Sequence, residues 1–194
     1  MDNIFTEAIG DMELTFETRK NAFSPQGIDR GTLAMLTVAN LPQQLTQDSK
    51  LLDLGCGYGV VGIYAAKLTS PHNIVMSDNS KSCIALSRLN AERNNVPDVK
   101  VVLSDGFHDL TDTDFDMILS NPPYHADFAV PKHFIEKGFN RLKVGGKMYM
   151  VTKRKDWYKN KLTAIFGGVK VFDVGEYYVF CAEKRSARYA NKGK

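Results

Sequence analysis

The sequence is poor in the residues on which metal, disulfide and membrane chemistry depend. It contains only 3 cysteines and 4 histidines, and no two cysteines have the C-x-x-C spacing. This composition indicates neither a zinc site nor a disulfide framework. No apolar run approaches the roughly 20 residues of a membrane-spanning helix, and residues 1–5 lack the basic flank of a signal peptide. We expect a cytoplasmic protein that binds neither a metal nor a membrane.

What the sequence does contain is a regular alternation of strand-like and helix-like segments. Its hydrophobic content of 43% in 194 residues suits one globular domain. We predict strands at 51–54, 72–78, 99–104, 115–120, 147–152, 169–174 and 177–182, and helices ending near 67 and covering 81–94, 132–142 and 156–166. Such alternation is typical of a parallel sheet with helices on both faces. Only Gly175 and Glu176 separate the last two strands, which predicts a hairpin and one antiparallel strand.

A glycine-rich loop follows the first predicted strand. Gly55, Gly57 and Gly59 permit positive φ and let a ligand lie directly against the backbone. The same loop contains the dinucleotide fingerprint G-x-G-x-x-G, which by itself leaves a nucleotide-dependent oxidoreductase open. Asp53 favours another cofactor, because its carboxylate would repel a pyrophosphate and suits a cationic amino group. Cys56 is typical of a small residue packed beneath a cofactor rather than of a nucleophile.

Acids also follow the next two predicted strands. Because ligands of open parallel sheets bind beyond the carboxyl ends of the strands, Asp53, Asp78 and Asp105 should gather on one rim. Asp78 is expected to accept hydrogen bonds from both hydroxyls of a ribose, and Asn79 is placed beside it. Asp105 is expected to accept one from an adenine amino group, with the Gly106 N–H at a ring nitrogen. Taken singly, each acid could equally be a helix cap or a turn residue.

The most informative motif is Asn-Pro-Pro-Tyr at residues 121–124, directly after an apolar strand. An amine on an aromatic ring is a poor nucleophile, because its lone pair is delocalised. The Asn121 side-chain oxygen and the Pro122 carbonyl could each accept one of its N–H bonds and leave the lone pair aimed at an electrophile. Pro123 stiffens this loop, and Tyr124 could stack on the ring. The alternative is a rigid turn that closes a buried strand. The adjacent His125 could take a proton or serve only at the surface.

Together these motifs resemble the class I S-adenosylmethionine-dependent methyltransferases. The likeness rests on the order Asp-Leu-Gly-Cys-Gly-Tyr-Gly at 53–59, Asp78, Ser-Asp-Gly at 104–106 and Asn-Pro-Pro-Tyr at 121–124. Within that superfamily, the chain most resembles a single-domain form of the RsmC-like group, the ribosomal RNA small-subunit methyltransferases C. That likeness rests on F-S-x-x-G-I-D-x-G-T at 23–32 and on S-N-P-P-Y-H at 120–125.

The resemblance implies a Rossmann-like, doubly wound sheet of seven mostly parallel strands with an antiparallel last strand. It implies that S-adenosylmethionine is the cofactor, with Asp53 and the glycines at its methionine part, Asp78 at the ribose and Asp105 at the adenine. Asn121 and the three residues after it would hold the acceptor amine, most simply guanine N2 of small-subunit ribosomal RNA. Adenine N6, a protein glutamine amide and a non-catalytic nucleotide-binding role stay open as alternatives.

Charge is distributed unevenly along a chain whose net charge is only +3. Residues 132–170 contain eleven lysines and arginines against two acids, and residues 184–194 add five more. Basic groups interleaved with aromatic rings suit RNA, although such runs are often only solvated faces. Lys153 and Arg154, just after a strand on the expected rim, are the best candidates for substrate contacts.

We expect an N-terminal segment (1–32) on the cofactor side, a methyltransferase domain (33–183) and a basic tail (184–194). The oligomeric state is not indicated.

Overall fold

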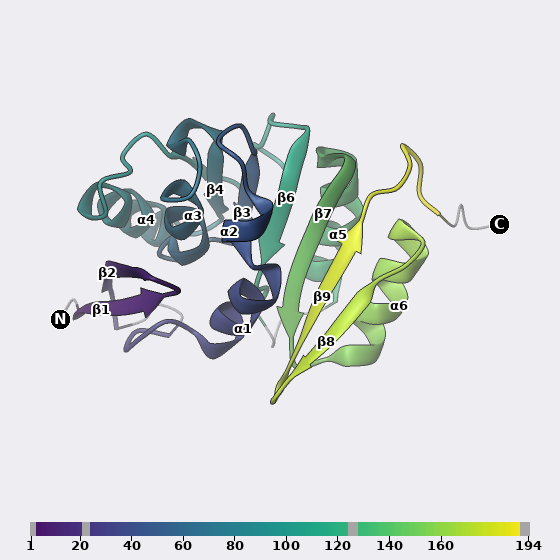
Figure 1. The fold of residues 1–194 in the computed structure, drawn as a ribbon, viewed down its shortest axis with the longest axis horizontal. Coiled ribbons are helices and arrows are strands. Elements are labelled where there is room, and N and C mark those ends of the chain that lie inside the picture. Colours follow the sequence, from purple (N-terminus) through teal and green to yellow (C-terminus); the bar gives the residue numbers. More distant parts are fainter. Residues whose placement is uncertain (1–2, 21–23, 124–127, 191–194) are drawn as a thin grey trace.

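A seven-stranded sheet with the order β5-β4-β3-β6-β7-β9-β8 forms the centre of the computed structural model, which describes residues 3–20, 24–123 and 128–190. The strands are β3 (Leu51–Leu54), β4 (Ile74–Asp78), β5 (Lys100–Leu103), β6 (Phe115–Ser120), β7 (Leu142–Thr152), β8 (Lys170–Val174) and β9 (Tyr177–Glu183). Strands β3 to β7 pair in parallel, whereas β9 runs antiparallel to both of its neighbours. Figure 1 shows the arrows of β6 and β7 pointing down and that of β9 pointing up. The predicted doubly wound fold and its reversed last strand are confirmed.

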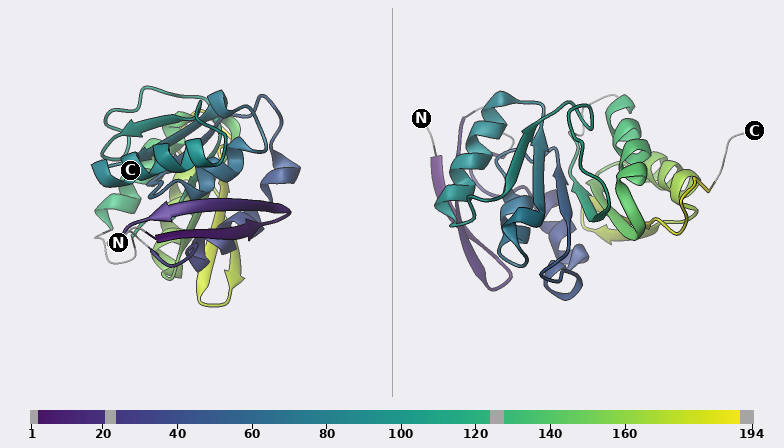
Figure 2. Two further views of the ribbon diagram at one scale, coloured as in Figure 1. Left: turned by 90° about the vertical axis from the view of Figure 1, so that its left-hand side faces the viewer. Right: turned by 90° about the horizontal axis from the view of Figure 1, so that it is seen from above.

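Helices cover both faces of this sheet (Figure 2). They are α1 (Arg30–Ala39), α2 (Leu41–Gln44), α3 (Val60–Ala66), α4 (Lys81–Arg93), α5 (Ala129–Arg141) and α6 (Lys155–Phe166), with a 3-10 turn η1 at Pro71–Asn73. Alternate strand residues point to opposite faces. Leu51 therefore packs in one core with α1 to α4, while Leu52 packs in the other with α5 and α6. None of the described helices is both long and apolar enough to cross a membrane.

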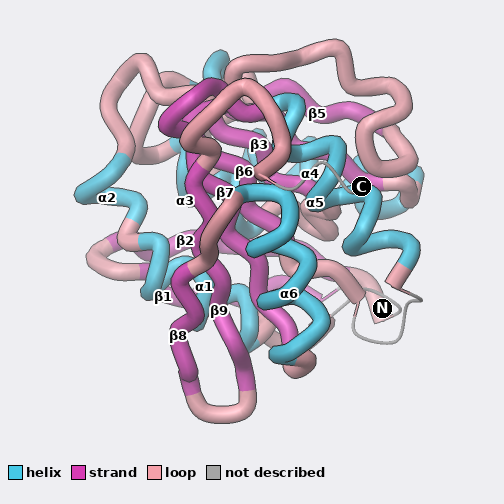
Figure 3. The backbone as a smooth tube through the Cα atoms, turned by 90° about the vertical axis from the view of Figure 1, so that its right-hand side faces the viewer, coloured by secondary structure: helices cyan, strands magenta, loops and turns pink. Residues whose placement is uncertain are grey.

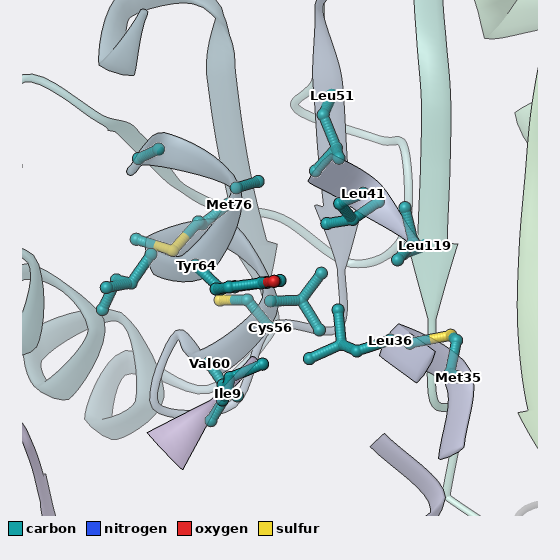
Figure 4. Close-up of a cluster of buried hydrophobic side chains, with 14 of the residues drawn as sticks. Ile9, Met35, Leu36, Leu41, Leu51, Cys56, Val60, Tyr64, Met76 and Leu119 are labelled. Atoms are coloured by element: carbon teal, nitrogen blue, oxygen red, sulfur yellow. The ribbon is translucent and has the colours of Figure 1, made fainter. Parts of the chain in front are cut away.

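The core on the α1–α4 side lies directly beneath the glycine loop. In Figure 4, Leu51 and Met76 from the sheet meet Leu36 from α1, Leu41 from α2 and Val60 from α3. These side chains are buried. Burial of large aliphatic side chains stabilises a fold by about 1.5–3 kcal/mol each, so this core fixes α3 and the preceding loop against the ends of β3 and β4.

The described N-terminus forms a hairpin, β1 (Asn3–Ile9) and β2 (Met12–Thr18), that the sequence pattern does not predict. Asn90 of α4 and Asn94, the C-cap of that helix, bind its edge. The Asn90 side chain accepts from the Glu17 N–H (2.7 Å) and donates to the Glu17 carbonyl (3.0 Å). Asn94 makes the same pair of bonds to Thr15, at 3.0 and 2.8 Å. Two side-chain amides thus take the place of a neighbouring strand, and β2 runs alongside α4 (Figure 2, left).

Three boundaries differ from the prediction by two residues or more. The strand predicted at 72–78 begins at Ile74, because residues 71–73 form the turn η1. Residues 143–146, which lie between the predicted helix 132–142 and the predicted strand 147–152, belong to β7 as a bulge, because the pair Phe115–Leu142 is followed directly by Met117–Lys147. Helix α5 begins at Ala129 rather than at Lys132. Pro131 is tolerated there because the first turn of a helix needs no backbone donor at that position. The β8–β9 hairpin extends beyond the end of α6 (Figure 3).

Candidate active site

The order of the strands creates a crevice beside β3. The chain passes outward from β3 to β4 and β5 and then returns to β6 on the other side of β3. Neighbouring connections therefore leave the carboxyl ends of β3 and β6 in opposite directions, and ligands of such sheets bind at this point. A cavity of about 320 Å³ lies there. Its lining contains the predicted residues Asp53, Gly55, Cys56, Gly57, Asp78, Asn79, Asp105, Gly106, Asn121, Pro122 and Pro123.

Asp53 is an almost fully buried carboxyl group at the floor of this cavity. Its Oδ2 accepts the Gly62 N–H at 2.9 Å, and its side chain is only 4% exposed. The pKa of Asp53 is raised to about 7. Burial is the main cause and the nearby Asp78 adds to it, while the hydrogen bond from the Gly62 N–H acts in the opposite direction. A cation in the cavity would favour the ionised form. Asp53 is therefore suited to a positively charged group on a ligand.

The glycine loop leaves space for a ligand at one position above all. Gly57 has φ +56°, and an added Cβ would meet no atom within 4 Å. Its N–H donates to Asp78 Oδ2 at 3.0 Å. Gly59 is not part of the cavity lining; it is the N-cap of α3, with φ 98°. Cys56 is 8% exposed, and burial raises the pKa of its thiol well above the usual value, which disfavours a nucleophilic role.

The other two acids take different positions at the rim. Asp78 Oδ1 accepts the Ser80 N–H at 2.9 Å, and the Ser80 hydroxyl caps α4. Each Asp78 oxygen thus has one backbone donor, and a carboxylate has further lone pairs with which to meet two adjacent hydroxyls. Asp105 is exposed, and Gly106 adopts φ +57° at the same wall. The three acids gather as the strand order requires.

Asn121 lines the cavity and has an unpaired side-chain acceptor. Its Nδ2 donates to Asp29 Oδ1 at 2.7 Å and to Thr32 Oγ1 at 3.0 Å. Its Oδ1 is buried and has no hydrogen-bond partner among the described residues. Because buried polar atoms are nearly always paired in native proteins, an orphaned one beside a cavity points to a ligand. The ligand atom that satisfies it must be a donor, such as the N–H of an amine.

Some lining residues were not predicted as site residues. Asp29 and Thr32 come from the start of α1, Cys83 from α4, and Phe134 from α5. The spacing of Asp29 and Thr32 is a capping signal, which could have located the helix start but not its contact with Asn121. Nothing in the sequence pattern distinguishes Phe134 from other core positions. The predicted residues Tyr124 and His125, and Phe23 of the family motif, lie outside the described residues.

Lys153 and Arg154 lie outside the cavity but on the same rim. Strands β6 and β7 are parallel, and Ser120 at the end of β6 pairs with Met150 near the end of β7. Asn121, which follows β6, and Lys153, which follows β7, therefore emerge at the same edge of the sheet. Lys153 forms an ion pair with Glu176.

Arg154 belongs to a stack of three planar groups, which we call the rim stack. Its guanidinium lies 5.0 Å from the centre of the Phe128 ring. Phe128 in turn stacks on Trp157, with ring centres 4.5 Å apart and planes inclined by 23°. Arg154 itself is exposed. An exposed guanidinium over an aromatic ring offers a charged and stackable surface.

Part of the expected basic tail is packed against the domain. Lys184 is 8% exposed, and its ammonium group donates to the Leu142 carbonyl at 2.6 Å. Tyr189 donates to the Glu136 carbonyl at 2.9 Å and packs edge-on against Phe139. These two residues are therefore not available to a substrate. No group of three His, Cys, Asp or Glu residues within the described ranges is arranged to hold a metal.

Most of the chain, residues 13–181, matches the family model described as the methyltransferase small domain. The chain belongs to the methyltransferase small domain family. The family resemblance carried by the motifs is thereby confirmed.

Relatives of this methyltransferase small domain include proteins that are named as ribosomal RNA methyltransferases. The ribosomal RNA large subunit methyltransferase G of Klebsiella pneumoniae (strain 342) is 31% identical over 172 residues, which cover 85% of this chain and 45% of that protein. YbxB of Bacillus subtilis is 30% identical over 177 residues, covering 89% of this chain and 87% of that protein.

Among solved structures, the 16S rRNA N2 G1207 methyltransferase RsmC of T. thermophilus, in complex with AdoMet and guanosine, superposes with a TM-score of 0.84. Its sequence is 28% identical, and the match covers 95% of this chain and 51% of that one. The chain therefore spans about half the length of RsmC and of methyltransferase G.

Proposed function

We propose that this chain is an S-adenosylmethionine-dependent methyltransferase that modifies an exocyclic amine, guanine N2 of ribosomal RNA, with the small-subunit RNA as the first candidate. The observation that carries the proposal is the orphaned Asn121 Oδ1 at the wall of a cavity that also contains Asp53, Asp78 and Asp105. A donor with a planar amine satisfies that atom, and the acids fit the parts of the cofactor.

The residues of the cavity fit S-adenosylmethionine group by group. When bound, this cofactor supplies a methyl group on a positively charged sulfur. Asp53, whose pKa is raised to about 7, is suited to the cationic amino group of the methionine part. Each oxygen of Asp78 can accept a further bond from a ribose hydroxyl, and Asp105 and Gly106, at the wall of the same cavity, are the candidates for contacts with the adenine. RsmC, a structural neighbour at 28% identity, contains AdoMet in its complex, which supports the same assignment.

Asn121 can hold the acceptor amine in position for attack on the methyl group. The N2 lone pair of guanine is delocalised into the ring, so the nitrogen must be held for attack in line with the methyl group. One N–H of the amine would donate to Asn121 Oδ1, and we infer that the carbonyl of Pro122, the next residue, accepts the other. After transfer the nitrogen is strongly acidic and loses its proton readily, so no dedicated base is required.

RNA as the substrate class is supported by the rim and by the relatives. The rim stack places Arg154 on the same edge of the sheet as Asn121, and stacked aromatic and guanidinium groups are typical of proteins that bind unpaired bases. Two of the three similar proteins, methyltransferase G and RsmC, carry large-subunit and 16S ribosomal RNA in their names. A single-stranded or loop guanine would reach the cavity most easily, because a paired base costs a few kcal/mol to extrude.

The test replaces Asn121 by alanine and measures transfer and cofactor binding separately. We expect Asn121→Ala to reduce methyl transfer to unmodified 16S RNA by about 10²-fold or more, while the dissociation constant of S-adenosylmethionine, measured by calorimetry, stays within about threefold. Asn140→Ala is the matched control, because Asn140 is an exposed residue of α5 that donates only to Tyr189. Unchanged transfer by Asn121→Ala, or a parallel loss of cofactor binding, contradicts the assignment.

A further inference from the structure

The Asn121 side chain does not determine its own orientation. A carboxamide can turn by 180° about its last bond, which exchanges an acceptor oxygen for a two-proton donor at nearly the same place. Turned the other way, Asn121 would present N–H groups to the cavity, and these would repel the N–H of an amine. The neighbours of the amide therefore decide whether the cavity accepts an amine.

Two acceptors at the start of α1 hold the amide nitrogen. Asp29 Oδ1 lies 2.7 Å from Asn121 Nδ2, and Thr32 Oγ1 lies 3.0 Å from it. Asp29 and Thr32 are bonded to each other as well: the Thr32 hydroxyl lies 3.4 Å from Asp29 Oδ1. Since a carboxylate oxygen only accepts, the Thr32 hydroxyl donates to Asp29 and can accept from Asn121. With the Thr32 hydroxyl proton directed at Asp29, both contacts to Asn121 require its nitrogen, and not its oxygen, to face α1.

The carboxylate itself is held by backbone structure. Asp29 is the N-cap of α1, where its Oδ1 accepts the Thr32 N–H at 2.9 Å. The preceding residue, Ile28, donates its N–H to Glu7 of the N-terminal hairpin at 2.9 Å. Asp29 is thus fixed from both sides before any ligand binds. Its negative charge also draws the amide N–H bonds toward it, which makes the far oxygen of the amide a stronger acceptor.

We propose that Asp29 is a positioning residue that locks the Asn121 carboxamide with its oxygen in the cavity and thereby selects an amine as the methyl acceptor. This inference rests on the proposed function for the role of Asn121. Thr32 completes the lock, with its hydroxyl bonded to both partners. The lock depends on a residue of the N-terminal part of the chain, so this part completes the acceptor site.

Two substitutions separate this role from that of a helix cap. Serine caps helices as well as aspartate does, but its shorter side chain does not reach Asn121. Asparagine keeps the shape and the acceptor and removes the charge. With labelled cofactor and unmodified 16S RNA as the probe, we expect Asp29→Ser to lower kcat by roughly 10- to 100-fold with little change in the KM for cofactor. Asp29→Asn should restore kcat to within roughly fivefold of the wild type. Equal kcat for the two variants contradicts the proposal.

A double-mutant cycle tests whether Asp29 acts through Asn121. Asp29→Ser introduced into Asn121→Ala should cause less than about twofold further loss of kcat. If the two losses instead multiply, Asp29 acts independently, for example by touching the cofactor, and the positioning role is wrong.

The same lock can be observed without any substrate. The side-chain amide protons of Asn121, identified as the NMR signals missing from Asn121→Ala, should exchange slowly with water in the wild type. In Asp29→Ser they should shift and exchange at least about tenfold faster, while backbone protection of α1 is kept. Unchanged signals overturn the lock whether or not the chain methylates RNA. Absence of transfer by the wild type, in contrast, would overturn the proposed function and leave this observation standing.

Discussion

Asp53 should make the binding of a cationic ligand depend on pH near neutrality. Its carboxyl group is buried, and burial raises its pKa from 3.8 to about 7. A ligand whose amino group lies beside Asp53 favours the ionised form, so the pKa falls in the complex, and below pH 7 binding must release a proton.

The expected size follows from the pKa. At pH 6 about a tenth of Asp53 is ionised in the free protein, and at pH 7.5 about three quarters is. Affinity should therefore rise by up to about eightfold between these pH values. The stability of the free protein should follow the opposite trend. Because the folded pKa of Asp53 is raised, its contribution to the free energy of unfolding should be fully present below about pH 3.8 and be lost as the pH rises through about 7.

The assay is isothermal titration calorimetry with S-adenosylhomocysteine, which carries the same amino group and cannot transfer a methyl. Titrations at pH 6, 6.5, 7 and 7.5 keep most of the α-amino group of the ligand in its cationic form, because an ordinary α-amino group has a pKa of about 7.7–8.0. Asp53→Asn is the control, because its side-chain oxygen can still accept the Gly62 N–H. It should bind more weakly at pH 7.5 and show no dependence on pH. A wild-type affinity that changes less than twofold over this range, or an equal slope in the variant, refutes the reasoning.

Two further predictions concern the packing of the loop and the rim. A Cβ on Gly62 would lie 2.3 Å from Met76 Cγ, so Gly62→Ala should lower the free energy of unfolding by about 1–3 kcal/mol in urea denaturation. Gly168→Ala, whose Cβ would meet nothing within 4 Å, should change it by less than about 0.5 kcal/mol; equal effects would contradict the close packing. Arg154→Ala should weaken binding of a ribosomal RNA fragment and reduce the salt slope by about one, with cofactor affinity unchanged. Lys170→Ala, at the first residue of β8, is the control and should leave RNA binding and its salt slope unchanged. Equal losses of RNA binding in the two variants would exclude the rim as the contact surface.

The parts of the site that the sequence predicts are those set by local pattern. Strand, glycine loop and helix around Asp53 follow from hydrophobic spacing, and the placement of Asp78 and Asp105 on one rim follows from the geometry of parallel sheets. The hairpin between β8 and β9 follows from the two residues that connect them. Each of these features depends on residues that are close in sequence or on a general rule of topology.

The parts that could not be predicted depend on contacts between distant segments. Asp29 lies 92 positions from Asn121, and no local pattern connects them. The N-terminal hairpin depends on Asn90 of α4, 73 positions from its partner in β2. Residues 143–146 carry two glycines that indicate a turn, but the Gly145 N–H donates to the Lys184 carbonyl at 2.7 Å, which holds them inside the paired strand.

Transfer of a methyl group to an amine of ribosomal RNA is the activity that we propose for this chain. The most direct measurement incubates the protein with S-adenosylmethionine labelled in the methyl group and, in parallel, with unmodified 16S RNA, 23S RNA, DNA and cell protein, and identifies the labelled product. We predict label in RNA as N2-methylguanine, with 16S RNA as the better substrate. Label confined to 23S RNA would move the target to the large subunit. Label only as N6-methyladenine or in protein, or no label despite cofactor binding, would contradict the account.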